Sequence, residues 1–451
     1  MKKRPILAIA GTVLALILTA CAAPANHSKA TPTPKETTKT AEIPDTPVGQ
    51  VTQWIIDEMN ADVDTESAGW AERLTDEFQA EVSADDIAAL INKQIRPARP
   101  LVATAYKGTE TEAVTTVAGA LGAPFDLSVA VDDQQRISGL FLKPAAPAHT
   151  PATSMGEVTT RLAALPGDTR ALIQIDGKTV LEADPDSAAP LGSIFKLYVL
   201  GAVSDAVQSG TIAWDDELTV TDDVRSLPSG ELQDAETGTK VSVREAAMKM
   251  ISISDNTATD MLIGAVGRES VEKAVADMGH LDPALLRPFL TTRELFTLSL
   301  SDRDDLRARW QKGDESGRRA LLKEVKAVPF DLSPADVGVQ THWQNDMEWF
   351  ASASDIAAAH DQLSTRAKAD DVITEVLTKN PGLTFDTTQW PTIAFKGGSN
   401  TGVLAGSWRA VRADGAVLTV VVMSADAAPI TADAQSELFG LVEDVFTLLA
   451  E

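Results

Sequence analysis

Strand-forming patterns occur at both ends of residues 150–451, and a long stretch of helical pattern separates them. Near the start, Ala171–Ile175 and Thr179–Glu182 flank Asp176-Gly177, a dipeptide typical of a type I′ hairpin turn. The patterns at the other end are three strands and a final helix, over Thr392–Phe395, Val403–Val411, Val417–Met423 and Ala432–Leu449. This order predicts one mixed sheet built from both ends of the region and packed against a helical block.

A smaller region precedes this one. The apolar spacing is helical from Val48, and Ser83-x-x-Asp86 is typical of a capped second helix. After Pro100 the period changes to two, which predicts strands over Leu101–Tyr106, Ala113–Ala118, Phe125–Val131 and Ile137–Leu142. We therefore predict an α+β chain: a small helix-plus-antiparallel-sheet domain over 47–146, then a mixed domain over 150–451.

The first 46 residues are typical of an export signal and a tether. A basic start precedes the apolar run Ile6–Leu18, which is too short to span a bilayer, so residues 1–20 are predicted to be a removed signal. The residues Leu18-Thr19-Ala20-Cys21 resemble the lipobox of bacterial lipoproteins, in which the cysteine carries lipid. A signal cut that leaves Cys21 as a free thiol is the alternative. We expect a flexible tether over 21–46 and a protein anchored to the bacterial membrane outside the cytoplasm.

Composition excludes several classes of function. The formal net charge is −26, without a basic run beyond the first residues, which argues against nucleic-acid binding. One cysteine cannot form an intramolecular disulfide, which argues against a disulfide scaffold. The five histidines are scattered along the sequence, so we expect no metal site. We predict no cofactor and a monomer.

The first chemical motif is the S-x-x-K spacing of Ser193 and Lys196, which opens an apolar run reaching Leu200. Residues three apart share a helix face, so the amine of Lys196 can stand beside the hydroxyl of Ser193. A serine at a helix N-terminus also lies at the positive end of the dipole, which favours a nucleophile. The alternative is that Ser193 only caps the helix.

Two more motifs follow in the chain. A capped helix beginning at Ser242 leads into Ser254-Asp255-Asn256, where a serine can relay a proton, the asparagine can hold a substrate amide and Asp255 can brace the loop. Lys396-Gly397-Gly398 then follows a strand pattern, where bare backbone lets a substrate lie along the edge. Alternatively, the second motif is a polar turn and the third a β-bulge with a solvated lysine.

In this order, the three motifs resemble the active-site set of class A β-lactamases and penicillin-binding proteins, and ISDNTATDMLIGAVG resembles their helix through the second motif. The resemblance covers about 150–451. It implies that Ser193 attacks a carbonyl, Lys196 takes its proton and Ser254 passes a proton to the leaving nitrogen. It further implies that Lys396 holds a substrate carboxylate and that the N–H groups of Ser193 and Ser399 hold the oxyanion. The implied substrate-binding residues are Asn256, Gly398 and Thr401.

The leading domain narrows the resemblance. A small α+β domain ahead of a β-lactamase-like one is similar to serine hydrolases related to the β-lactamase-like protein of clavulanic acid biosynthesis and to actinobacterial lipoproteins. In those proteins the leading domain has a fold like ketosteroid isomerases or cystatins.

The chain departs from the family pattern in three places. Gly397 stands where the family has Thr or Ser, and Ser399 and Thr401 can take over hydroxyl contacts. Glu294 is the candidate base for deacylation, yet it also completes a Thr-x-x-Glu capping box with Thr291. A charged helical stretch between Ser301 and Val328 is longer than the family spacing and can reshape the cleft.

These patterns predict a lipid-anchored serine hydrolase that acylates Ser193 with a β-lactam or a related amide or ester and hydrolyses it, slowly if the base for deacylation is absent. The first alternative is a penicillin-binding D,D-peptidase acting on cell-wall stem peptides. The second is a sensing or binding lipoprotein without turnover. An α/β-hydrolase is disfavoured because Gly397-Gly398-Ser399-Asn400-Thr401 misses the G-x-S-x-G elbow by its last residue.

Overall fold

The computed structural model of the chain describes residues 40–119, 124–145, 149–227, 229–332, 336–338 and 340–450. The chain divides into two compact units, Met1–Pro147 and Ala148–Glu451, which we describe one at a time. The predicted signal and Cys21 lie outside the described residues, so their roles stay predictions.

The first unit packs helices against an antiparallel meander in the order β1-β2-β3-β4. Thr46 caps the first helix by accepting the N–H of Gly49 (3.1 Å), and that helix buries Val51, Ile55 and Met59 in the core of the unit. The main elements are α1 (Pro47–Asn60), α2 (Ser67–Ala71), α3 (Asp76–Glu81), α4 (Ala84–Leu90), β1 (Leu101–Gly108), β2 (Glu112–Gly119), β3 (Phe125–Val131) and β4 (Ile137–Pro144). The predicted helix-then-sheet order is present.

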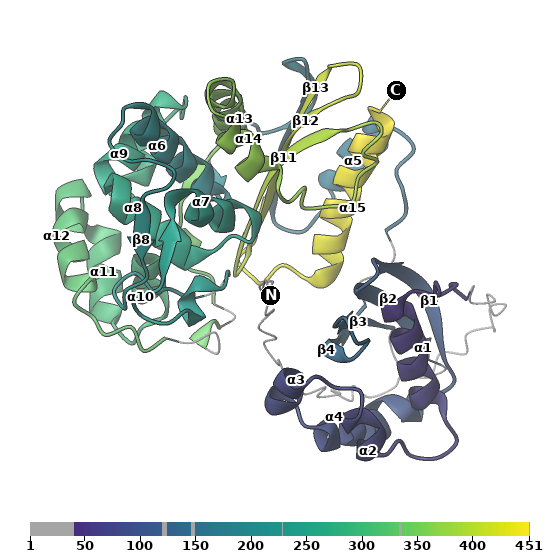
Figure 1. Cartoon of the computed structure of the whole chain (residues 1–451). Coiled ribbons are helices and arrows are strands. Elements are labelled where there is room, and N and C mark those ends of the chain that lie inside the picture. Colours follow the sequence, from purple (N-terminus) through teal and green to yellow (C-terminus); the bar gives the residue numbers. More distant parts are fainter. Residues whose placement is uncertain are drawn as a thin grey trace, which may run out of the picture. The chain divides into compact units, whose positions relative to one another are not determined.

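The second unit is built on a five-stranded antiparallel sheet in the order β11-β12-β13-β5-β6 (Figure 1). Its strands are β5 (Asp168–Ile175), β6 (Lys178–Ala183), β11 (Thr392–Asn400), β12 (Val403–Val411) and β13 (Val417–Ala425). The two ends of the unit meet where β13 pairs with β5, with Val421 opposite Leu172. At the β5–β6 turn Asp176 and Gly177 both have positive φ (49° and 73°), as a type I′ turn requires.

This sheet is covered on both faces, which explains why its central strand is apolar at nearly every position. Along β13, Leu418, Val420 and Val422 pack with α5 (Met155–Leu162) and α15 (Ala432–Leu448), whereas Val421 and Met423 pack with the helical block. Figure 1 shows α5 and α15 on one side of the sheet and α13 and α14 on the other. Because successive side chains of a strand point to opposite faces and both faces are covered here, apolar residues run almost continuously along β13.

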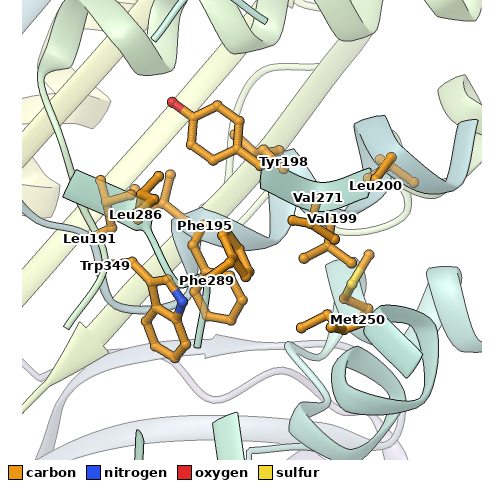
Figure 2. Packing of buried hydrophobic residues seen from close by; sticks show 14 of the residues in the cluster. Leu191, Phe195, Tyr198, Val199, Leu200, Met250, Val271, Leu286, Phe289 and Trp349 are labelled. Atoms are coloured by element: carbon orange, nitrogen blue, oxygen red, sulfur yellow. The ribbon is translucent and has the colours of Figure 1, made fainter. Parts of the chain in front are cut away.

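The helical block surrounds α6 (Lys196–Gln208), whose Tyr198, Val199 and Leu200 are fully buried (Figure 2). The block also contains α7 (Val243–Ser252), α8 (Asn256–Val266), α9 (Arg268–Asp277), α10 (Thr292–Leu300), α11 (Asp304–Lys312), α12 (Glu315–Val325), α13 (Ala353–Ala367) and α14 (Asp371–Thr378). Two short pairs complete the unit, β7 (Ala189–Pro190) with β10 (Phe350–Ala351) and β8 (Glu217–Thr219) with β9 (Lys240–Ser242). A buried α6 holds the residues that precede it in a fixed place.

The predicted fold class, a small helix-and-sheet domain before a β-lactamase-like mixed domain, is confirmed. One local prediction is wrong: Lys396-Gly397-Gly398 does not follow a strand but lies inside β11, because the strand continues in regular register with β12 as far as Asn400. In the part of the chain that the structure describes, none of the helices combines the length and the apolar character needed to cross a membrane.

Candidate active site

Ser193 lies in a 3₁₀ turn, η3 (Gly192–Phe195), that runs directly into α6. The turn starts at Gly192, which has a φ of +49°, a conformation that costs glycine little. The N–H of Ser193 lies in the first turn of this helical segment, where an intrahelical acceptor does not exist. The Ser193 side chain is half-buried. The turn therefore presents a hydroxyl and an N–H together at the positive end of a buried helix.

Lys196 follows one turn later and is completely buried. Its Nζ donates to Ser254 O (2.6 Å), Ser254 Oγ (3.1 Å) and Asn256 Oδ1 (2.6 Å). Burial lowers the pKa of Lys196 well below its usual value, and the positive charge of Lys396 lowers it further. A neutral amine in this place can accept a proton from a neighbouring hydroxyl.

Ser254 and Asn256 stand on a braced turn between α7 and α8. The carboxylate of Asp255 caps α8 by accepting the N–H of Ala258 (2.7 Å). It also accepts the N–H groups of Glu231 (2.8 Å) and Leu232 (2.9 Å), which ties the turn to the segment between β8 and β9. Ser254 itself has a φ of +59°, which is uncommon for serine. The brace holds this strained residue with its hydroxyl toward both lysines.

Lys396 reaches the same hydroxyl from the sheet. Its Nζ donates to Ser254 Oγ (3.0 Å) and Gly397 O (2.8 Å), and burial lowers its pKa to about 7. A hydroxyl has two acceptor lone pairs and one proton. With both lone pairs facing amines, Ser254 keeps its proton available for a third group, as a relay requires.

A second hydrogen-bonded pair holds the backbone of β11 at this lysine. Ser407 Oγ donates to Lys396 O (2.9 Å) and accepts from His360 Nε2 (3.0 Å). Burial lowers the pKa of His360 to about 3, so the ring is neutral. Neither residue is part of a motif, and only the structure reveals them.

The turn at Ser193 and the middle of β11 touch backbone to backbone. A Cβ on Gly192 would lie 2.5 Å from Ser399 N, and a Cβ on Gly398 would lie 2.7 Å from Ser193 N. Both positions therefore require glycine, and the contact brings the backbone nitrogens of Ser193 and Ser399 close together. Two N–H groups side by side can stabilise an oxyanion.

Two of the predicted substrate-binding residues, Asn256 and Thr401, already have side-chain hydrogen-bond partners within the protein. Asn256 is buried, and both polar atoms of its side chain are hydrogen-bonded. Its oxygen accepts from Lys196 and its nitrogen donates to Leu227 O (2.9 Å). The hydroxyl of Thr401 donates to Gly338 O (3.2 Å), a residue of the segment between α12 and β10. Asn256 is therefore placed to orient Lys196, and Thr401 is already hydrogen-bonded to the segment that precedes β10.

Glu294 is committed to structure. It forms the capping box of α10 with Thr291, accepting its N–H (2.9 Å), and its other oxygen accepts from Arg268 (2.7 Å). The neighbouring residue that contacts the second motif is Thr292, the first residue of α10, whose Oγ1 donates to Asn256 O (3.3 Å). The capping-box interpretation is confirmed, and the geometry gives no support to Glu294 as the deacylation base.

Sequence reasoning missed Glu348, a carboxyl that is 4% exposed. It accepts from the side chain of Asn400 (2.8 Å) at the end of β11, and burial raises its pKa to about 7. Nothing in its local sequence signals this contact. Within the described residues, His, Cys, Asp and Glu form no group of three or more that could hold a metal.

The buried helical block, the mixed sheet and the three converging motifs define the class of β-lactamase-like serine hydrolases. Residues 157–389, just over half of the chain, match the family described as "Beta-lactamase enzyme family", and the chain belongs to it. Residues 43–137 match the family described as "ORF 12 gene product N-terminal". The predicted resemblance to this family is thereby confirmed, while the narrower resemblance to lipoproteins and to clavulanic acid biosynthesis stays a prediction.

Several solved structures are similar. A β-lactamase from Sphaerobacter thermophilus DSM 20745 has 21% identity over 67% of this chain and 97% of its own, with a TM-score of 0.48. The structure of PBP-A has 18% identity over 67% and 98%, with a TM-score of 0.46. A class A β-lactamase from Mycobacterium abscessus has 15% identity over 66% and 99%, with a TM-score of 0.45. Among curated proteins there is no match.

Proposed function

We propose that this protein is an acyl-serine hydrolase that opens a β-lactam, or a related amide or ester, through a covalent intermediate on Ser193. The observation that carries the proposal is the meeting of the amines of Lys196 and Lys396 at one hydroxyl, that of Ser254. Three segments far apart in the chain supply these groups. Amines and a hydroxyl in contact can take a proton from a serine nucleophile and return it to a leaving nitrogen, as amide acyl transfer needs.

In the proposed reaction, Ser193 Oγ bonds to the substrate carbonyl carbon and its proton passes to neutral Lys196. The negative oxygen of the tetrahedral intermediate is held by the N–H groups of Ser193 and Ser399. The C–N bond then breaks, and the proton returns through Ser254 to the leaving nitrogen. Lys396, when charged, binds the substrate carboxylate. Water finally attacks the acyl ester and regenerates Ser193.

We propose that the last step is slow. Both carboxylate oxygens of Glu294 already accept hydrogen bonds from Thr291 and Arg268, so this residue is not placed to activate water. A persistent acyl-enzyme is also what a penicillin-binding D,D-peptidase forms with penicillin, so that activity on cell-wall stem peptides is the second candidate.

The deciding experiment is intact-mass spectrometry of the full-length chain mixed with benzylpenicillin and with a chromogenic cephalosporin, sampled from seconds to hours. The Ser193→Ala variant is the control. We expect a mass gain on the wild-type chain that clears slowly. Rapid clearance with hydrolysed drug would indicate an efficient β-lactamase, and no gain on the wild-type chain would refute the proposal in favour of a binding or sensing protein.

We further propose that the chain is attached to the outer face of a membrane through lipid on Cys21. The support is the sequence alone, in which small residues and an apolar run precede this cysteine. Fractionation of cells that express Cys21→Ala should move the protein out of the membrane fraction; unchanged membrane retention would contradict the anchor.

A further inference from the structure

Trp349 is bound to the nucleophile-bearing segment on both sides of Ser193. Its backbone O accepts the N–H of Leu191 (2.9 Å), and its ring stacks on Phe195 with centroids 3.6 Å apart. Figure 2 shows the Trp349 ring beside Phe195, within the buried cluster that also holds Phe289. The position of Trp349 is therefore coupled to that of the turn that carries Ser193.

Glu348 is bound to the other half of the site. One of its oxygens accepts from Asn400 Nδ2 (2.8 Å), and the other accepts the N–H of Trp349 (3.1 Å). Asn400 in turn accepts the N–H of Thr401 (2.9 Å) and directly follows Ser399 in β11. The carboxyl group thus joins the end of β11 to the backbone that supports the turn at Ser193.

We call Glu348 and Trp349 the clamp. Its two members are adjacent in the chain, yet they hold two segments that are about two hundred residues apart in sequence and that supply the two N–H groups of the proposed oxyanion site. We infer that Glu348 is a positioning residue, which sets the N–H of Ser399 relative to that of Ser193 through Asn400. This inference rests on the proposed acylation of Ser193.

The hydrogen bonds of the clamp require the ionised carboxylate form of Glu348, because both of its oxygens accept. A carboxylate accepts hydrogen bonds at both oxygens, whereas a glutamine amide offers one acceptor and turns an N–H donor toward the other partner. Because Glu348 is 4% exposed, water cannot easily replace a lost acceptor. Glu348→Gln should therefore release either Asn400 or Trp349 with little change in volume.

The test compares the full-length wild-type chain with Glu348→Gln and Glu348→Ala. The matched control is Asp444→Asn, a buried carboxyl of α15 that accepts the N–H of Ala152 (2.7 Å) and contacts His149. For each protein we would measure the acylation rate with benzylpenicillin, the noncovalent dissociation constant, the inhibition constant of phenylboronic acid and the unfolding midpoint. The boronate is a direct probe because its adduct with a serine places an oxygen in the oxyanion site.

We expect Glu348→Gln to slow acylation by about 10- to 100-fold and to weaken boronate inhibition by a similar factor, with an unchanged noncovalent dissociation constant. Asp444→Asn should acylate at the wild-type rate whatever its unfolding midpoint. Wild-type acylation and boronate inhibition in both Glu348 variants would overturn the inference alone. A wild-type chain that neither acylates nor binds the boronate would overturn the proposed function, and this inference with it.

Discussion

Gly398→Ala tests the close contact between β11 and the turn at Ser193. A methyl group at this position would lie 2.0 Å from Leu191 O and 2.7 Å from Ser193 N. Ordinary contact begins near 3.4 Å, so the two backbones would have to separate by about 1.4 Å. Neither neighbour is a flexible side chain that could turn away.

The expected effect on activity follows from that distance. A misplacement of about 1 Å at a reacting centre can lower a rate by about 100-fold, and loss of one oxyanion donor lowers it by about 10²–10³-fold. We therefore expect Gly398→Ala to acylate at least about 100-fold more slowly than the wild-type chain. Overpacking should also lower the free energy of unfolding by about 1–3 kcal/mol.

Quenched-flow intact-mass spectrometry gives the acylation rate, and denaturant unfolding gives the stability. Gly264→Ala is the matched control, because this glycine lies in α8 with nothing within 4 Å of an added methyl group. The control should acylate normally and gain up to about 1 kcal/mol of stability from helix propensity. Acylation of Gly398→Ala at the wild-type rate would refute the assigned oxyanion geometry.

Three further predictions follow from the site. Ser193→Ala and Lys196→Ala should each lower acylation by at least about 100-fold while the chain stays folded, and turnover retained in both variants would refute the mechanism. Because burial lowers the pKa of Lys396 to about 7, raising the pH above 7 removes its charge, so kcat/KM for a carboxylate-bearing β-lactam should fall relative to that for a neutral ester. A constant ratio of the two values from about pH 6 to about pH 9 would contradict this role. Glu294→Gln should lower the free energy of unfolding by about 1–2 kcal/mol, since one of its two donors loses an acceptor, and accumulation of acyl-enzyme in this variant would instead restore Glu294 as the base.

The pH dependence of stability has a definite sign at Lys396. The folded-state pKa, about 7, lies below the usual 10.5, so between these values the unfolded chain binds more protons than the folded one. Stability should therefore rise with pH across this window, and Lys396→Met should remove that part of the rise.

Much of the fold can be predicted from sequence because local pattern and burial agree. Alternating or continuous apolar strands and the Asp176-Gly177 turn mark the sheet, and the paired residues Val421 and Leu172 lie in predicted strands. The end of β11 is harder to predict from the sequence, because Gly397 and Gly398 carry no side chains whose pattern would show that the strand continues.

The site was predictable only where motif and spacing carry the information. Ser193 and Lys196 are three residues apart, so helix geometry predicts that they share a face, and the structure shows Lys196 at Ser254 and Asn256 of the second motif. The contact of Glu348 with Asn400 spans 52 residues and follows no local pattern, so only tertiary packing reveals it. At Glu294 the sequence allowed two interpretations, because a capping box and a base near a helix start use the same residue type.

The sheet joined from both ends of the unit also determines when the site can exist. During synthesis the segment with Ser193 emerges early, whereas β11, with Lys396 and Ser399, is among the last segments made, and the bond from Val417 N to Asp176 Oδ1 closes a loop of 241 residues. Such late, long-range pairing is slow to form. A nascent or prematurely ended chain therefore carries Ser193 without β11, so the proposed active site stays incomplete until the C-terminal strands are in place.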